Sequence, residues 1–465
     1  MGSWPGIEEI KRKMQVLYEH AAEMNCVNTA EIKEGLEPLF EQYGYRTTHE
    51  DDASAQILLI HDDGVGDFIN CSPAIHEMRR TYPEAVITLV VPHQSYDMAV
   101  TCPYVDHVIV DEKKCDRKDP LALFQWYTHF AAQFLSYHYD LAIPFSPYGS
   151  DVLFAYLTGA VHRVGFQSKD GKLSGPFHAE HVRGLLTDQV PPRARGLHAV
   201  YAYLPIAEAL AGREVQDAAP EIWTLAAETE IWKQKLHMAA PDASWMAVII
   251  GSSSGRRHWP VASYADLLQK VLKEEAGDVR FLLLGGPREK EDGDKLLAAL
   301  PEHMAWNAVG AMNYRESAAA LSCCHLYIGN DTGLMHAAAA VGLPVLSPCC
   351  YPADVPMQYD AVPLIHHPYG VPTVFVRPAH ALSGCQHPQQ DDVRWGCVSE
   401  KPHCITQVTP ELMFQGYRLL KEQIRRGKKD VLYLYEMENP THDGTVVAIE
   451  KRDVERFRWY PKEKA

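Results

Sequence analysis

Short apolar runs alternate with longer segments of helical periodicity along the first half of the chain. Runs of strand length that are rich in apolar residues occur at 56–61, 85–91, 105–111 and 139–145. Between them, apolar residues recur at helical spacing over 70–82 and 120–137. Strands covered on both faces are apolar throughout, whereas amphipathic helices repeat about every 3.6 residues. The pattern predicts an α/β domain with a parallel, Rossmann-like sheet.

The same alternation restarts in the second half of the chain. Strands are expected at 245–251, at 279–286 and up to Ile328, and helices at 263–275, 288–300 and 314–322. Because ligands of such folds bind at the carboxyl ends of parallel strands, two Rossmann-like domains in tandem are expected to face a binding cleft.

Both ends of the chain depart from this alternation. Residues 7–45 carry apolar stripes at helical spacing, and two strand-like runs, DVLYLYEM and GTVVAIEKRDV, flank the turn sequence NPTHDG near the C-terminus. These breaks predict a helical N-terminal extension (1–50), a first Rossmann-like domain (51–220), a linker (221–242), a second Rossmann-like domain (243–420) and a C-terminal appendage with a small β-hairpin (421–465).

Composition narrows the function classes. The net charge of −16 argues against a nucleic-acid-binding protein, which usually has a basic surface. An apolar run long enough to cross a membrane is absent from the sequence, and so is the apolar core of a signal peptide near residue 1. The eleven cysteines are therefore expected to be reduced thiols in a cytoplasmic protein.

The stretch from Gly329 to Pro348, GNDTGLMHAAAAVGLPVLSP, predicts a strand, a tight loop, a helix and a second strand. A helix N-terminus presents free N–H groups and partial positive charge, which suits a diphosphate. Gly333 allows the backbone to approach a ligand closely. Asp331 is expected to accept hydrogen bonds from sugar hydroxyls, and His336 to reach the same pocket one turn later.

Residues 331–344 fit the pattern D-[ST]-G-x-x-H-x-A-A-A-x-G-x-P at every specified position. The stretch therefore resembles the signature of the lipopolysaccharide heptosyltransferase family, also called glycosyltransferase family 9. The alternative is a buried βα turn of any doubly wound protein. The resemblance covers about residues 57–412 and implies a GT-B fold, with a first domain that binds the acceptor and a second that binds the nucleotide-sugar donor. Thr332 and Gly333 then belong to the donor site.

A second motif of the family occurs near the first strand. Gly66 and Asp67, followed by Pro73 and by Tyr82-Pro83, are similar to its G-D, Pro and Y-P positions. The resemblance implies that Asp67 is the general base that deprotonates an acceptor hydroxyl. The alternative is that Asp67 only caps the following helix. Asp62 and Asp63 lie nearby but do not match the position of the family's base.

The loop GSSSGRRHWP, residues 251–260, resembles the diphosphate-binding loop of the family. Arg257 stands where relatives usually carry Lys or Arg, and Ser252 and Ser253 match hydroxyl positions. A guanidinium there would stabilise charge on the leaving nucleoside diphosphate. Arg256 is a substitute for this role, and a surface basic pair is the alternative.

Two further donor contacts are implied by the family alone. Glu289, in GGPREKED, fits a G-x-P-x-E motif whose Glu binds the ribose, and Met312 matches a segment near the adenine. An acidic first turn of a surface helix explains Glu289 equally well, and a lone Met is commonly a core residue.

A metal is not expected to be required for catalysis. The candidates for a structural iron or zinc site are Cys385, Cys397 and Cys404, with His387 and His403 beside them. Their spacing lacks the C-x-x-C pairs of structural zinc sites, which favours ordinary thiols, although relatives that glycosylate proteins bind iron in this region.

The leading hypothesis is an inverting glycosyltransferase that moves heptose from ADP-heptose to an acceptor hydroxyl of a lipopolysaccharide core, another glycan, a lipid-linked sugar or a protein. A nucleotide-sugar epimerase of GT-B fold and a non-catalytic nucleotide-sugar-binding scaffold are the alternatives. The expected location is the cytoplasm, with at most peripheral contact of the basic segment 425–429 with the inner membrane. The terminal segments are candidates for a homo-oligomer interface.

Overall fold

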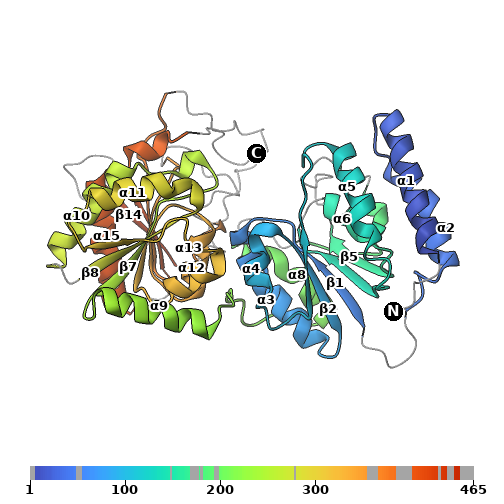
Figure 1. The fold of residues 1–465 in the computed structure, drawn as a ribbon, viewed down its shortest axis with the longest axis horizontal. Helices are drawn as coiled ribbons and strands as arrows, with labels where there is room; N and C mark the ends of the chain where they lie inside the picture. Colours follow the sequence, from blue (N-terminus) through green and yellow to red (C-terminus); the bar gives the residue numbers. More distant parts are fainter. Residues whose placement is uncertain are drawn as a thin grey trace, which may run out of the picture. The chain divides into compact units, whose positions relative to one another are not determined.

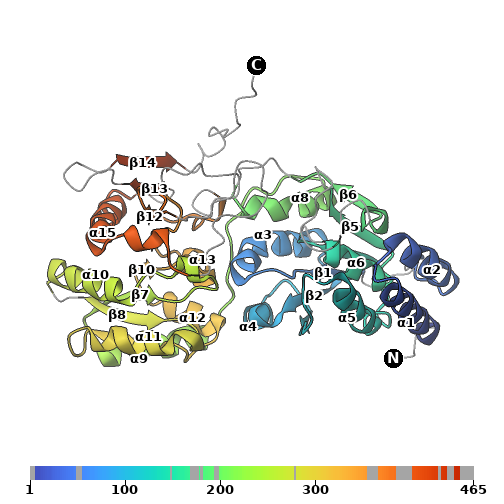
Figure 2. The same cartoon turned by 90° about the horizontal axis from the view of Figure 1, so that it is seen from above.

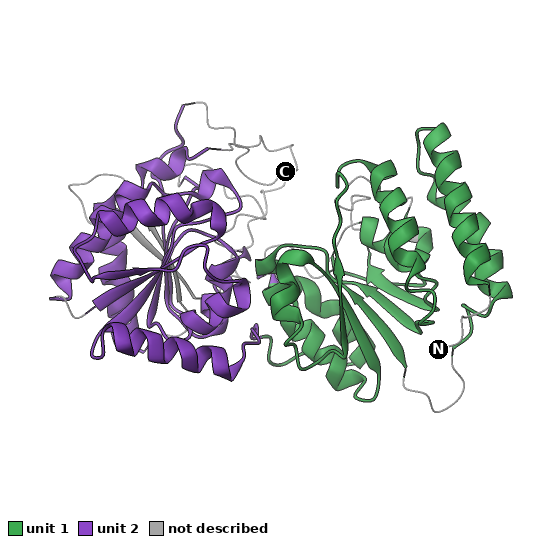
Figure 3. Cartoon of the chain, in the orientation of Figure 1, with its two compact units in different colours: residues 1–193, 200–218 green, residues 194–199, 219–465 purple. Residues whose placement is uncertain are grey.

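The computed structural model describes the chain in several stretches: residues 6–48, 55–146, 149–167, 177, 182–192, 198–276, 279–352, 365–383, 401–427, 431–436 and 445–450. The chain forms two compact units (Figure 3). Unit 1 comprises Met1–Arg193 and Val200–Ala218, and unit 2 comprises Ala194–Ala199 and Ala219–Ala465.

Unit 1 is built on a six-stranded sheet in the order β3-β2-β1-β4-β5-β6 (Figure 1). Every pair of neighbours in it is parallel. The strands are β1 (Gln56–Ile60), β2 (Val86–Pro92), β3 (His107–Asp111), β4 (Leu141–Pro144), β5 (His162–Phe166) and β6 (Asp188–Val190). All four residues of β4 are buried, as expected for a central strand covered on both faces.

The helices of unit 1 are α1 (Ile7–Glu23), α2 (Thr29–Gln42), α3 (Val65–Thr81), α4 (Tyr96–Ala99), α5 (Pro120–Ala132), α6 (Gly149–Leu157) and α8 (Val200–Ala211). Two short 3-10 turns, η1 (His93–Ser95) and η2 (Arg183–Leu185), complete the unit. The buried sides of α1, α2, α5 and α6 share one apolar core with Leu58 and Ile60 of β1.

The predicted N-terminal helices are confirmed as a packed part of unit 1. Ile10, Met14 and Leu17 form the buried stripe of α1, which lies beside α5 in both views (Figure 1, Figure 2). The Asn28 side chain starts α2, because its Oδ1 accepts a hydrogen bond of 3.1 Å from the N–H of Ala30.

Unit 2 is built on an eight-stranded sheet in the order β14-β13-β12-β11-β10-β7-β8-β9. Its strands are β7 (Ser244–Ile249), β8 (Val279–Leu284), β9 (Ala305–Asn307), β10 (Leu326–Gly329), β11 (Val345–Pro348), β12 (Thr373–Val376), β13 (Val431–Glu436) and β14 (Thr445–Glu450). All neighbours are parallel except β13 and β14. This antiparallel pair is the predicted C-terminal hairpin, and it extends the sheet through a parallel pairing of β13 with β12. Its predicted turn lies outside the described residues.

The helices of unit 2 are α9 (Ala226–Ala239), α10 (Val261–Glu274), α11 (Lys290–Ala298), α12 (Tyr314–Leu321), α13 (Gly333–Ala340) and α15 (Pro410–Arg425), with 3-10 turns η3 (Gly255–Arg257), η4 (Pro287–Glu289) and η5 (Cys404–Gln407). The segment expected as a linker contains α9, and Glu228 of α9 pairs with Arg315 of α12 at 2.8 Å. In the described part of the chain, all helices are too short or too polar to span a membrane.

Candidate active site

The loops that follow β7 and β10 come together at the carboxyl edge of the unit 2 sheet. The two strands pair directly, with Gly329 opposite Ile249. A Cβ on Gly329 would lie only 2.6 Å from the Ile249 carbonyl oxygen, so the close approach of the strands requires glycine here. The loops that continue from Ile249 and Gly329 therefore lie side by side and form one site.

Asn330 joins these loops through a fully buried side chain. Its Oδ1 accepts hydrogen bonds from the Trp259 N–H at 3.0 Å and the Tyr264 hydroxyl at 2.9 Å. Its Nδ2 donates to the Ile250 carbonyl at 2.7 Å. Hydrogen bonds to a buried amide side chain are strong, and leaving such a group unpaired is costly. This network therefore fixes the position of the adjacent Asp331.

Arg257 and Asp331 form an ion pair in this site. The Arg257 Nε lies 3.4 Å from Asp331 Oδ2, and the Ser252 hydroxyl donates to the Asp331 carbonyl at 3.1 Å. The nearby carboxylate of Asp331 raises the pKa of Arg257 although burial opposes it. The structure thus brings together three predicted site residues, Arg257, Asp331 and Ser252, whereas Ser253 is exposed beside them.

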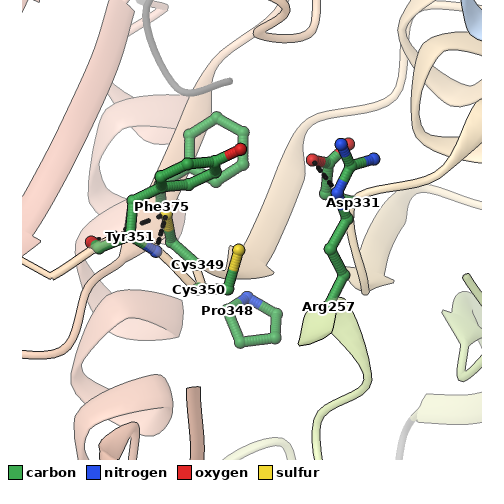
Figure 4. Close-up of a pocket in the computed structure, with 7 residues that line it drawn as sticks. All are labelled: Arg257, Asp331, Pro348, Cys349, Cys350, Tyr351 and Phe375. Atoms are coloured by element: carbon green, nitrogen blue, oxygen red, sulfur yellow. Dashed lines mark hydrogen bonds and ion pairs between the residues drawn. The ribbon is translucent and has the colours of Figure 1, made fainter. Parts of the chain in front are cut away.

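A small pocket opens between this ion pair and the end of β11 (Figure 4). Its lining residues are Arg257, Asp331, Pro348, Cys349, Cys350, Tyr351 and Phe375. The cavity volume is about 10 Å³, roughly what one water molecule needs. Burial raises the pKa of Cys349 to about 11, so its thiol is neutral at physiological pH. Figure 4 shows the thiols of Cys349 and Cys350 and the rings of Tyr351 and Phe375 on the side of the pocket opposite the ion pair.

The helix α13 starts at the edge of the same site. Thr332 is its N-cap residue, with extended backbone, and Gly333 is its first residue. His336 is buried one turn later, and burial lowers its pKa to about 4. His336 is therefore neutral at pH 7, which lets one ring nitrogen donate and the other accept a hydrogen bond.

Glu289 lies over three glycines at the ends of β7 and β8. A Cβ on Gly251 would meet the Glu289 Cδ at 2.9 Å, and one on Gly286 would meet its Oε2 at 3.0 Å. Gly285 is the third, with its Cβ position 3.5 Å from the Glu289 Cβ. The carboxylate is therefore held against the backbone of the loop that leads to Ser252, rather than pointing away as an ordinary surface Glu would.

Asp67 lies in unit 1, in the first turn of α3. The sequence placed it in a glycine loop before a helix starting at residue 70, and that boundary is wrong. Gly64 has an extended backbone and serves as the N-cap, so the helix already begins at Val65. The Asp67 Oδ2 lies 3.2 Å from the position of a Cβ on Gly64. An acidic group in the first turn of a helix interacts favourably with the helix dipole.

Part of the chain is similar to a known protein family. Residues 128–348 match the family model of Glycosyltransferase family 9 (heptosyltransferase). Just under half of the chain therefore matches this family. It is 24% identical over 308 residues to lipopolysaccharide heptosyltransferase 2 of Escherichia coli K12, a match that covers 63% of this chain and 82% of the relative. The protein is accordingly a glycosyltransferase.

Solved structures of glycosyltransferase family 9 proteins confirm the predicted GT-B-like fold. The structure of ADP-heptose lipopolysaccharide heptosyltransferase II of E. coli superimposes with a TM-score of 0.58 at 19% identity, covering 80% of this chain and 99% of that one. A family 9 glycosyltransferase of Veillonella parvula gives a TM-score of 0.60 at 18% identity, covering 81% of this chain and 100% of that one.

The remaining predicted residues of this glycosyltransferase are less informative. Met312 is half-buried. Cys404 is buried, with its Sγ 3.3 Å from His403 Nδ1, whereas Cys385 and Cys397 lie outside the described residues. Within the described stretches, groups of three or more metal-ligating side chains are absent, and the nine described cysteines are free thiols.

Sequence reasoning missed Asn330 and the Cys349–Tyr351 wall of the pocket. The Asn directly before the Asp331 motif was a usable signal, because a polar residue at the end of a buried strand needs hydrogen-bond partners. The wall offered no such signal, since Cys349 and Cys350 look like core packing in the sequence.

Proposed function

We propose that this protein is an inverting glycosyltransferase that transfers heptose from ADP-heptose to a hydroxyl of a glycan acceptor. The observation that carries the proposal is the junction of the Arg257 and Asp331 loops, with its ion pair of 3.4 Å and its Ser252 hydrogen bond. The donor is supported by the E. coli structural neighbour, an ADP-heptose lipopolysaccharide heptosyltransferase. The glycan acceptor is supported by the relatives named lipopolysaccharide heptosyltransferase 2.

In this mechanism Arg257, Ser252 and Ser253 hold the diphosphate, together with the N-terminal N–H groups of α13. The leaving ADP gains negative charge as the bond to the anomeric carbon breaks. A guanidinium stabilises that charge more in the transition state than in the ground state. Since Asp331 already orients Arg257, the cation needs little rearrangement as the reaction proceeds.

Asp331, Thr332 and the neutral His336 bind the hydroxyls of the transferred sugar. A carboxylate accepts hydrogen bonds from adjacent hydroxyls, and a neutral imidazole can either donate or accept one. Glu289 binds the ribose hydroxyls from its place over Gly251 and Gly286, and Met312 lies at the adenine.

Asp67 acts as the general base. Its carboxylate takes the proton of the acceptor hydroxyl while that oxygen attacks the anomeric carbon from the side opposite the diphosphate. The new C–O bond forms, the bond to ADP breaks, and the anomeric configuration inverts. A metal ion is not part of this step, because the arginine and the helix N-terminus supply the positive charge.

The decisive experiment is calorimetric titration of the purified protein with ADP, UDP, GDP and ADP-heptose, with and without EDTA. We expect ADP and ADP-heptose to bind best, independently of EDTA, and Asp331→Ala to weaken binding at least tenfold. Asp266→Ala, an exposed position on α10, is the matched control and should bind normally. A preference for UDP or GDP would contradict the donor, and the absence of any binding would contradict the proposed donor site.

The reaction itself separates a transferase from an epimerase. With ADP-heptose and a glycan acceptor, Asp67→Asn should lose transfer by about a hundredfold or more while ADP binding is kept. The anomeric configuration of the product, read by NMR, should be opposite to that of the donor. Release of free heptose and ADP at the same rate without an acceptor would instead indicate an epimerase.

A further inference from the structure

A network of buried charges lies at the carboxyl edge of the unit 1 sheet, and the proposed mechanism does not use it. Asp62 follows β1, Asp111 ends β3 and Asp151 lies in the first turn of α6. All three carboxyl groups are buried. Lys113 and Arg117, from the segment after β3, are the cations that reach them. The network therefore draws on three of the strand ends where ligands bind in this kind of fold.

Both cations of the network are engaged by Asp62. Lys113 Nζ pairs with one carboxylate oxygen of Asp62 and Arg117 with the other. Lys113 also lies 3.2 Å from Asp111 Oδ2 and donates to the Tyr127 hydroxyl at 2.8 Å. An anionic ligand would have to compete with Asp62 and Asp111 for these cations, which are already neutralised.

Asp151 is the group whose hydrogen bonding is incomplete. Its side chain is only 1% exposed. One carboxyl oxygen accepts a hydrogen bond of 3.3 Å from the Ser150 hydroxyl, but Oδ2 has no partner among the described residues. Burial, reinforced by the negative charge of Asp62, raises the pKa of Asp151 to about 8. At neutral pH it is mostly a carboxylic acid, which can donate a hydrogen bond as well as accept one.

The loop between β1 and α3 connects this network to the predicted base. Asp62 and Asp63 belong to that loop, both interact electrostatically with Asp151, and Asp67 follows in the first turn of α3. The Asp63 side chain accepts a hydrogen bond of 2.8 Å from the Gly64 N–H. Asp62, Asp63 and Asp67 therefore come from one short segment at the carboxyl edge of the unit 1 sheet.

We infer that the carboxyl edge of unit 1 binds the acceptor as an uncharged polyol, through hydrogen bonds to Asp63, Asp151 and the Asp62 pair, and excludes acceptors with a phosphate or carboxylate on the reacting ring. This inference rests on the proposed function, since it names the acceptor class of the same reaction. Sugar hydroxyls both donate and accept, which matches a mixture of carboxylates and a carboxylic acid. An anionic group would meet the Asp63 carboxylate and two cations that Asp62 and Asp111 already neutralise, so like-charge repulsion is not offset there.

The test compares neutral and anionic probes of the same shape. Saturation-transfer NMR is recorded on the full chain, in the presence of saturating ADP, with methyl hexopyranosides and their 6-phosphates at pH 7. We expect the neutral glycosides to bind at least tenfold better than the matched phosphates. Better binding of the phosphates, or no binding of any neutral glycoside, overturns the inference.

Variants locate the effect in the network. Asp151→Asn keeps an uncharged group that can donate, so it should bind the neutral probes within about twofold of the wild type, whereas Asp151→Leu should weaken them at least tenfold. Asp62→Asn releases Arg117 and leaves Lys113 paired with Asp111, so it should improve phosphate binding at least tenfold. Asp116→Asn, exposed in the segment after β3, is the control and should change neither. Unaltered phosphate binding in a folded Asp62→Asn protein contradicts the inference.

Two further measurements keep the outcomes distinct. Arg117, whose side chain is 53% exposed, can be replaced by Ala with little risk to folding, and this change should weaken the phosphates further without weakening the neutral probes. ADP titration of each variant reports on the donor site of unit 2. If the wild type does not bind ADP, the proposed function is refuted. If it binds ADP but prefers the sugar 6-phosphates to the neutral glycosides, only the acceptor class is refuted.

Discussion

The two units differ in the charges that they place at the carboxyl edge of the sheet. Each places polar side chains at the carboxyl edge of a parallel sheet. In unit 2 one arginine faces one aspartate beside neutral thiols and aromatic rings. In unit 1 three buried carboxyl groups share two cations. In the proposed mechanism, the fold sets the sheet edge at which each ligand binds, whereas the balance of charge at that edge sets which ligand it accepts.

Removing the cation from unit 2 should have the largest effect. Arg257→Ala should lower kcat for transfer by about 10²–10³-fold, because the charge on the leaving diphosphate loses its partner. Arg257→Lys should recover part of this loss, since a lysine keeps the charge but not the fork geometry. Steady-state kinetics with ADP-heptose check both, and Arg425→Ala on α15 is the control. An unchanged kcat in Arg257→Ala would show that Arg257 does not stabilise the leaving diphosphate.

Neutralising the buried acid of unit 1 should alter stability in a pH-dependent way. The pKa of Asp151 is raised to about 8 in the folded protein, above its value of about 3.9 in an unfolded chain. Between these values the native state binds more protons, so the wild type loses stability as pH rises. Asp62, Asp63, Lys113, Arg117 and Tyr127 are the groups that face Asp151 electrostatically.

Asp151→Asn should therefore be more stable than the wild type by a margin that grows from pH 5 to pH 8. The growth should not exceed about 1.4 kcal/mol per pH unit. Urea unfolding at several pH values measures it, and the exposed Asp242→Asn should show no such trend. A margin that shrinks with rising pH would mean that Asp151 is ionised in the native state.

Removing the buried Asn330 side chain of unit 2, the hub of its loop network, should lower the stability of the protein by an amount that does not depend on pH. Asn330→Ala leaves the Trp259 N–H and the Tyr264 hydroxyl without their acceptor in a buried site. The free energy of unfolding should fall by about 2–3 kcal/mol. Urea denaturation checks this value, with Gln234→Ala on the exposed side of α9 as the control. A change below about 0.5 kcal/mol would show that the loops hold together without Asn330.

The smallest effect is expected at the ribose contact. Wild-type protein should bind ADP about tenfold better than 2′-deoxy-ADP, since one hydrogen bond to a charged group is worth about 1.5 kcal/mol. Glu289→Gln should reduce this preference, and calorimetry measures the ratio directly. A preference that survives in Glu289→Gln would assign the ribose to another side chain.

The sequence allowed most of the sheet core to be predicted, because its strands are apolar runs and its helices repeat regularly. The helix α9 was missed as such, since only Trp232 and Leu236 of its side chains are buried and two apolar positions make a weak period. The start of α3 was misplaced because Gly64, Gly66 and Asp63 are also typical of a loop.

The two sites also differed in how far their residues could be grouped from the sequence. Asp331, Thr332, Gly333 and His336 are close in sequence, so a local motif was sufficient to group them. The unit 1 network joins Asp62 to Lys113, 51 residues away, and such a pairing follows from the order of strands in the sheet. Local patterns cannot give it, because they hold no information on which strand ends are neighbours.

The Asn330 hub also bears on the heat of donor binding. A loop that is disordered before binding loses conformational entropy when a ligand orders it, and this loss offsets part of the favourable enthalpy. The loops of Trp259 and Asp331 are already tied together by a buried side chain. ADP should therefore bind with a small entropic penalty, and loosening the hub should make association more exothermic yet weaker.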